Sequence, residues 1–166
     1  MTQYHNPVLL EASIEGLNII PNGTYVDVTF GGGGHSKAIL DCLDVGGRLL
    51  GFDQDTDAFK NVLVDSRFDF IHSNFSNLSQ YLKYHKAVPV EGILADFGVS
   101  SYQFNTRERG FSTRLDARLD MRMNQSQPLD AFEIINNYSE EDLKTLFYVY
   151  GELKNSKAIA SKIIDR

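Results

Sequence analysis

The sequence predicts an α/β protein in which a doubly wound parallel sheet is followed by an arginine-rich loop and further helices. Three observations support this fold. Short β-branched and aromatic segments alternate with segments of helical period, four consecutive glycines follow the first such strand, and acidic residues end the second and fourth. The 166 residues are 42% hydrophobic and 23% charged, which is typical of a folded globular chain.

The predicted elements alternate along the chain. Pro7 begins a first helix, Ser76 caps a later one, and Ser139 opens another with Asp142 as its capping-box partner. Cys42 is expected to be a small core residue. The predicted strands are 24–30, 46–55, 68–75 and 90–98, and the helices after them are 36–43, 56–63, 76–85, 139–152 and 156–166. Residues 99–130 are predicted to be irregular.

Composition excludes several classes of protein. One cysteine rules out an internal disulfide and a cysteine-based metal cluster, and we predict no metal site. No apolar run reaches the roughly 20 residues of a membrane helix, and the N-terminus lacks the layout of a signal peptide, so we predict a cytoplasmic protein without membrane contact. The net charge of -6 argues mildly against a general nucleic-acid binder, although residues 105–123 carry five arginines against three acids.

The segment "GGGGH" (31–35) lies between a predicted strand and a predicted helix, where bare backbone allows a ligand to approach closely. Its spacing does not complete the dinucleotide fingerprint G-x-G-x-x-G, and no Lys-Ser/Thr pair follows as in a phosphate loop. Asp53 ends the second strand about 20 residues later, where a carboxylate commonly accepts from a ribose diol. Asp55 is expected instead to cap the next helix.

The other strand ends add further candidates. Phe75, with Asn74 beside it, can stack on an adenine or belong to the core. Asp96 ends an apolar strand, where a carboxylate suits an amino-bearing reactant. His35 either contacts the ligand or points to solvent. A glycine loop without its third glycine, a ribose acid, an aromatic and a second acid together favour S-adenosylmethionine over a nicotinamide cofactor.

Six blocks then carry a family resemblance across nearly the whole chain. They are "HNPVLL" (5–10), "VDVTFGGGGHS" (26–36), "DQD" (53–55), "DFGVSSYQF" (96–104), "RGFS" (109–112) and "LDMRM" (119–123). In this order they closely resemble the ribosomal RNA small-subunit methyltransferase H family, also called MraW. The resemblance implies a Rossmann-like methyltransferase fold and S-adenosylmethionine-dependent methylation of the N4 amine of a cytidine in 16S rRNA of the bacterial small subunit. The cofactor contacts that it implies are Gly33, Gly34, His35, Asp53, Phe75, Asp96 and Gln103.

The resemblance leaves the proton acceptor for the amine open. Other amino-methyltransferases use an Asp/Asn-Pro-Pro-aromatic motif after the fourth strand, whereas this chain has "DFGV" there. Asp96 is the first candidate for the catalytic acceptor, and Ser100 or Ser101 is a candidate for assisting it.

RNA contacts are expected in the arginine-rich loop, because arginines can hold the phosphates that flank an exposed base. The candidates are Arg107, Arg109, Arg114, Arg118 and Arg122, although Arg122 is also a candidate structural partner of a carboxylate. We therefore divide the chain into a cofactor-binding part (1–105) and the start of an inserted helical, RNA-recognising domain (106–166).

Members of the family are about twice as long as this chain. We accordingly expect an incomplete sheet of four strands and weak or no activity of the chain alone. A truncated fragment that binds S-adenosylmethionine or rRNA is the first alternative, and a nicotinamide-dependent oxidoreductase is a distant one. A homodimer is retained as an alternative to a monomer.

Overall fold

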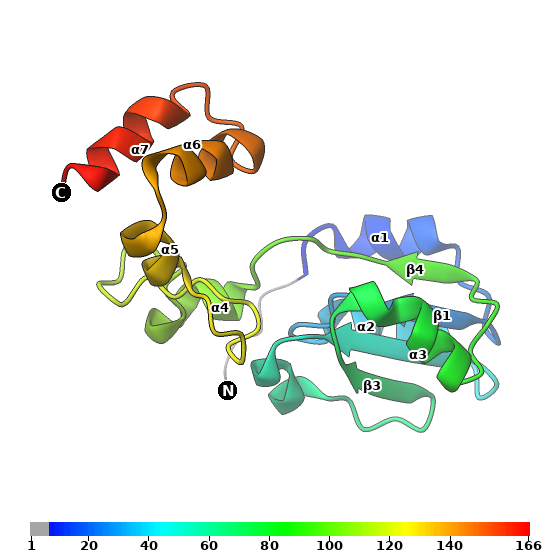
Figure 1. Ribbon diagram of the computed structural model, residues 1–166. Helices are drawn as coiled ribbons and strands as arrows, with labels where there is room; N and C mark the ends of the chain where they lie inside the picture. Colours follow the sequence, from blue (N-terminus) through cyan, green and yellow to red (C-terminus); the bar gives the residue numbers. More distant parts are fainter. Residues whose placement is uncertain (1–6) are drawn as a thin grey trace. The chain divides into compact units, whose positions relative to one another are not determined.

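A computed structural model describes residues 7–166 of the protein. The chain forms two compact units, Met1–Tyr102 and Gln103–Arg166, and Figure 1 shows the elements of each. The division falls three residues before the predicted boundary at 105/106. Of the "HNPVLL" block, His5 and Asn6 lie outside the described residues. Within residues 7–166 no helix has the length and apolar character needed to cross a membrane.

The first unit contains a parallel sheet of four strands. These are β1 (Thr24–Asp27), β2 (Arg48–Asp53), β3 (Phe68–His72) and β4 (Gly92–Leu94), in the spatial order β3-β2-β1-β4. Chain order runs outward from β1 to β3 and then returns to the other side of β1, which is the doubly wound arrangement. The predicted α/β fold class is confirmed.

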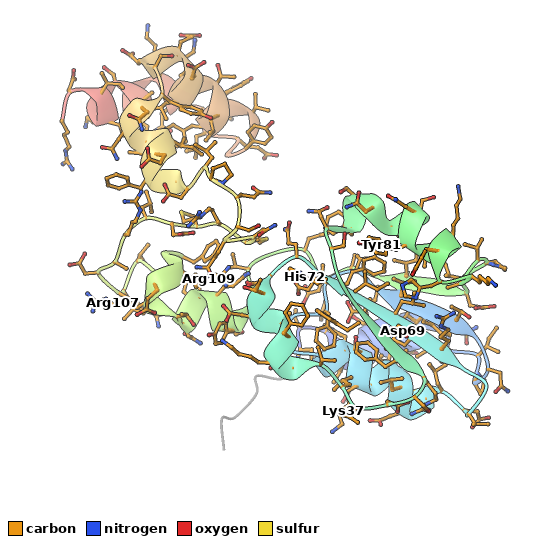
Figure 2. The ribbon with its side chains drawn as sticks, turned by 60° about the horizontal axis from the view of Figure 1, so that its bottom comes forward. Lys37, Asp69, His72, Tyr81, Arg107 and Arg109 are labelled. Atoms are coloured by element: carbon orange, nitrogen blue, oxygen red, sulfur yellow. The ribbon has the colours of Figure 1, made fainter. Side chains whose placement is uncertain are left out.

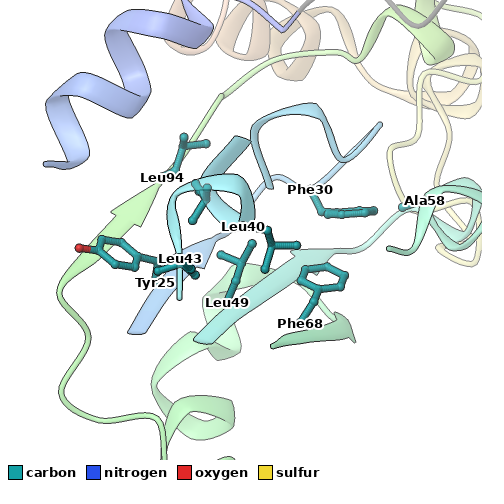
Figure 3. Close-up of a cluster of buried hydrophobic side chains, with 9 residues drawn as sticks. Tyr25, Phe30, Leu40, Leu43, Leu49, Ala58, Phe68 and Leu94 are labelled. Carbon is teal, nitrogen blue, oxygen red and sulfur yellow. The ribbon is translucent and has the colours of Figure 1, made fainter. Parts of the chain in front are cut away.

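Two apolar clusters cover the two faces of this sheet. On one face, side chains such as Tyr25 and Leu49 pack with helices α1 (Leu10–Leu17) and α2 (Gly34–Cys42), and Figure 3 shows this cluster. On the other face, Val26 and Leu50 pack with helix α3 (Leu78–Tyr84). Neighbouring strand residues enter opposite clusters because side chains alternate across a strand.

Several predicted elements of the first unit differ from the structure. The first helix begins at Leu10 rather than at Pro7. Residues 56–63 were predicted to be an α-helix but contain the 3₁₀ helix η1 (Thr56–Asn61), because only Ala58 on its apolar side is fully buried. Cys42, the last residue of α2, is exposed, so the prediction of a core cysteine is wrong.

The segment before α3 also differs from its prediction. A second 3₁₀ helix, η2 (Phe75–Asn77), precedes α3, and the side chain of Asn74 accepts a hydrogen bond from the N–H of Ser76. Ser76 was predicted to cap the helix after β3. In the structure Asn74 is the cap, and Ser76 supplies the N–H that it accepts.

The second unit begins with most of helix α4 (Ser101–Asn105) and the 3₁₀ helix η3 (Arg107–Arg109). Three helices follow the arginine-rich loop: α5 (Ala131–Asn137), α6 (Glu140–Val149) and α7 (Ser156–Ile164). The predicted cap at Ser139 is confirmed, since its Oγ accepts from the N–H of Asp142. Sequence patterns missed α4 and α5, which have five and seven residues, too few to show a clear helical period.

Candidate cofactor site at the strand ends

The carboxyl ends of the four strands lie at one edge of the sheet, and the chain order reverses between β1 and β4. Main-chain hydrogen bonds also join the segment just after β1 to the two adjacent strands. Val28 N–H donates to Leu94 O of β4, and Phe30 N–H donates to Phe52 O of β2, both at 2.9 Å. Open α/β sheets bind ligands in the crevice at such a reversal. The sheet therefore brings the loops after β1, β2 and β4 together at one place.

The glycine loop between β1 and α2 has little room for side chains. Gly33 has φ +76, and a Cβ there would lie 2.9 Å from the ring of Phe30. At Gly34 a Cβ would lie 2.3 Å from Cγ of Pro7, because the side chain of Pro7 lies directly against the loop. Both glycines are thus required by the packing of the loop itself, whatever ligand approaches it.

Asp53 connects the end of β2 to this loop. Its Oδ2 accepts from Gly31 N–H at 2.7 Å, and its Oδ1 accepts from Asp55 N–H at 2.9 Å. Burial raises the pKa of Asp53 above its ordinary value, and the two N–H donors partly offset that effect. As predicted, Asp55 caps the following helix, its Oδ1 accepting from Asp57 N–H.

Asp96 lies just beyond β4, across β1 from Asp53. Its N–H donates to Thr29 Oγ1 at 2.7 Å, and its side chain is exposed. Asp96 and His35 lie on the wall of a cavity of about 150 Å³ between the start of α1, the start of α2 and the end of β4. The cavity is lined by Val8, Leu9, Ser13, His35, Leu94, Ala95 and Asp96.

Phe75 lies after β3 with 42% of its surface exposed, so it is not the core residue that the alternative prediction required. Its ring centroid is 5.7 Å from that of Phe97. The neighbouring Asn74 donates from Nδ2 to Gln54 Oε1 at 2.8 Å, which ties the end of β3 to the end of β2.

The remaining candidates lie in different environments. His35 is 7% exposed, and its Nε2 is 3.0 Å from Val8 O, so the prediction that it points to solvent is wrong. Ser100 is partly buried just before α4. Gln103 is buried and belongs to the second unit, so the structure does not place it against the strand ends of the first.

The arginines of the second unit are largely engaged within it. Arg109 was predicted to lie on an RNA-binding surface, but it is 1% exposed, and its Nη2 donates to the carbonyls of Arg122 and Met123. That prediction of surface exposure is wrong because the loop folds around this guanidinium. Figure 2 shows Arg109 and the neighbouring Arg107, whose Nε donates to Asp116 O.

Two further arginines form ion pairs with acids of the same unit. Arg118 binds Asp130 at 2.9 Å and Glu133 at 3.1 Å while half of its side chain remains exposed. Arg122 binds Asp120 at 2.5 Å, which favours its alternative structural reading. Arg114 differs, because its exposed side chain forms no ion pair within residues 7–166.

Sequence reasoning missed a buried hydrogen-bonded group beneath the loop. Asp27 is fully buried and accepts from Ser36 Oγ at 2.7 Å and from Thr29 N–H at 3.0 Å. Burial raises the pKa of Asp27 despite these donors. An acidic residue inside the apolar strand "TYVDVTF" was the available signal, since a buried carboxylate requires partners.

Comparison with known proteins shows the family of this chain. Residues 2–166 match the MraW methylase family over essentially the whole chain. The chain belongs to this family. Within residues 7–166 no group of three His, Cys, Asp or Glu side chains is arranged to hold a metal ion.

Named relatives show the same membership and its extent. The chain is 56% identical over 164 residues to ribosomal RNA small subunit methyltransferase H of Christiangramia forsetii, covering 99% of this chain and 54% of that protein. The protein of the same name from Bacteroides thetaiotaomicron is 58% identical over 161 residues, covering 97% and 53%. The chain therefore spans about half the length of the curated relatives that it matches.

Proposed function

We propose that this chain is the cofactor-binding part of an S-adenosylmethionine-dependent methyltransferase that modifies the N4 amine of a cytidine in 16S rRNA of the bacterial small ribosomal subunit. The observation that carries the proposal is the placing of two acids at the reversal of the sheet: Asp53, at the end of β2, binds the glycine loop, and Asp96, just beyond β4, binds Thr29 before that loop. The names of the relatives, which are small-subunit rRNA methyltransferases, support the substrate.

The residues at the strand ends fit a nucleoside joined to an amino acid. A carboxylate has about four acceptor sites, so the bonds of Asp53 to Gly31 and Asp55 leave capacity for ribose hydroxyls. The exposed ring of Phe75 offers a face for adenine. We propose that Gly33, Gly34 and His35 contribute main-chain and ring contacts, and that Gln103 completes the set.

Methyl transfer requires that the amine be aligned with an electrophilic methyl group. The sulfonium of S-adenosylmethionine supplies this methyl group. As nitrogen attacks, the carbon–sulfur bond breaks, and the amine must lose one proton. Asp96 is the proposed acceptor because its carboxylate lines the small cavity at the end of β4. An engineered apolar cavity of about 150 Å³ holds benzene, so this volume suits one six-membered ring. Ser100 is retained as an assisting hydroxyl.

RNA contacts are proposed for the exposed arginines of the second unit. Arg107 and Arg118 line a hollow of about 340 Å³ together with Glu108 and Ala117. Arg114, with no ion pair in the described part of the chain, is the best candidate for a phosphate contact. A cytoplasmic location and a homodimer remain parts of this proposal.

Calorimetry with S-adenosylmethionine, S-adenosylhomocysteine and NADH tests the cofactor. We expect the first two to bind and NADH not to bind, and binding of NADH alone would refute the proposal. Transfer of a labelled methyl group to small ribosomal subunits, followed by nucleoside analysis of the 16S rRNA, tests the product. Cofactor binding without methyl transfer would favour the alternative of a non-catalytic fragment.

A further inference from the structure

A hydrogen-bonded connection runs from the first turn of α2 to the segment after β4. Ser36 Oγ donates to Asp27 Oδ2 at 2.7 Å, and Thr29 N–H donates to Asp27 Oδ1 at 3.0 Å. Thr29 Oγ1 then accepts from the N–H of Asp96 at 2.7 Å. Asp27 and Ser36 are fully buried, so the inner end of this connection is rigidly held.

Thr29 lies between the buried carboxylate of Asp27 and Asp96 at the edge of the cavity. Its hydroxyl oxygen lies 3.4 Å from Asp27 Oδ1, and this carboxylate oxygen can only accept when ionised. The hydroxyl proton is therefore drawn toward Asp27, and a lone pair is left toward the N–H of Asp96. Valine has nearly the same shape as threonine but cannot make either bond.

The hydroxyl acts where main-chain pairing between β1 and β4 stops. The last such bond joins Val28 N–H to Leu94 O, and β4 itself ends at Leu94. Two residues later, the side chain of Thr29 holds the main chain of Asp96. Beyond it, Gly98 adopts φ +149, a conformation that suits a chain leaving the sheet. This side-chain bond thus joins Asp96 to the segment after β1 where main-chain pairing has ended.

We propose that Thr29 is a positioning residue, whose hydroxyl holds Asp96 at the wall of the cavity beside the glycine loop. This inference rests on the proposed function, in which the carboxylate of Asp96 meets the cofactor and the amine. Loss of the hydroxyl is expected to leave the sheet formed and to let the segment after β4 move, so that the carboxylate of Asp96 no longer has one fixed place.

The test compares Thr29→Val and Thr29→Ser with Thr24→Val, a matched control at the start of β1, the strand that precedes Thr29. Amide hydrogen exchange of Asp96, followed by NMR on the full chain, reports the bond directly. We expect Thr29→Val to exchange roughly tenfold faster at Asp96, as loss of about one hydrogen bond predicts. Thr29→Ser and Thr24→Val are expected to exchange like the unchanged protein. Unchanged exchange at Asp96 in Thr29→Val overturns the proposal.

A double-mutant cycle with Asp96→Ala separates positioning from a general loss of structure. The affinity for S-adenosylhomocysteine should fall in Thr29→Val and in Asp96→Ala, and the double variant should fall no further than Asp96→Ala alone. Additive losses would mean that Thr29 does not act through Asp96. If the unchanged protein binds no S-adenosylhomocysteine, the proposed function fails, whereas the exchange rate of Asp96 still decides the role of Thr29.

Discussion

Two groups of candidate residues, the acids at the strand ends of the first unit and the arginines of the second, differ in their partners. In the first, Asp53 and Asp96 form no ion pair within the described residues, and Asp53 is held by main-chain N–H groups alone. In the second, Arg118 and Arg122 bind carboxylates, and Arg109 is buried against carbonyls. Asp53 and Asp96 remain able to receive donors from a ligand, unlike acids such as Asp69 that pair with an arginine of the same unit. Most of the candidate arginines of the second unit hold their own loop together. A cluster of like residues in a sequence is therefore not by itself a charged surface.

The strongest test of this contrast is Arg109→Met. Removing a guanidinium that is 1% exposed leaves the carbonyls of Arg122 and Met123 without their donor, so we expect the free energy of unfolding to fall by about 3 kcal/mol. Urea denaturation followed by circular dichroism measures the change. Arg114→Met is the matched control and should unfold like the unchanged protein; equal losses in both variants would contradict a structural role specific to Arg109.

Asp53→Asn tests whether the carboxylate of Asp53 binds the cofactor. The amide keeps one oxygen for Gly31 N–H, but it loses the charge and turns its NH₂ group toward the N–H of Asp55. Affinity for S-adenosylhomocysteine should therefore fall by roughly tenfold to a hundredfold. Asp55→Asn is the control, because Asp55 caps η1. Calorimetry gives both affinities, and a larger loss in Asp55→Asn would reverse the assignment of the ribose ligand.

Phe75→Ala is expected to have a smaller effect on the same affinity. Stacking of a base on an aromatic ring contributes about 1–3 kcal/mol, and the partly exposed ring of Phe75 belongs at the lower end, near a tenfold loss. Tyr84→Ala, at an exposed aromatic that ends α3, should leave the affinity unchanged. If both variants bind S-adenosylhomocysteine normally, adenine does not rest on Phe75.

Arg114→Ala tests whether this arginine, which is exposed, contacts an RNA phosphate. One lost phosphate contact should weaken binding to small-subunit rRNA by a few fold and lower the slope of log affinity against log salt by about one. Filter binding at several salt concentrations measures both quantities. Lys162→Ala, in the last turn of α7, serves as the charge-matched control; a similar loss there would indicate attraction by net charge rather than a contact by Arg114.

The smallest expected effect concerns pH and Asp27. Burial raises the pKa of this carboxyl in the folded state, so the folded protein binds more protons than the unfolded one between the ordinary value of 3.8 and the raised pKa. This group's contribution to stability is therefore present below 3.8 and is lost as pH rises through that window. Asp27→Asn should flatten this part of the stability curve, as denaturation at a series of pH values would reveal; an unchanged curve would mean that Asp27 titrates normally.

The sheet was predictable because each strand carries its own signal, such as the apolar run that ends at Asp96 and the aromatic run before the glycines. Because Asp53 and Phe75 follow predicted strands, the sequence also indicated them as candidate cofactor contacts. The burial of Arg109 could not be predicted, since it depends on carbonyls of residues 122 and 123 that turn toward it only in the folded loop. The support of Asp96 by Thr29 was equally hidden, because 67 residues separate the two in sequence.

The contact between Pro7 and the glycine loop has a practical consequence for anyone who purifies this protein. Gly34 lies against Pro7, and Val8 O is within 3.0 Å of His35 Nε2, so the backbone of residues 7 and 8 rests on the loop. An affinity tag fused ahead of Met1 would begin only six residues from that contact. A tag fused at the other end of the expressed polypeptide avoids this contact.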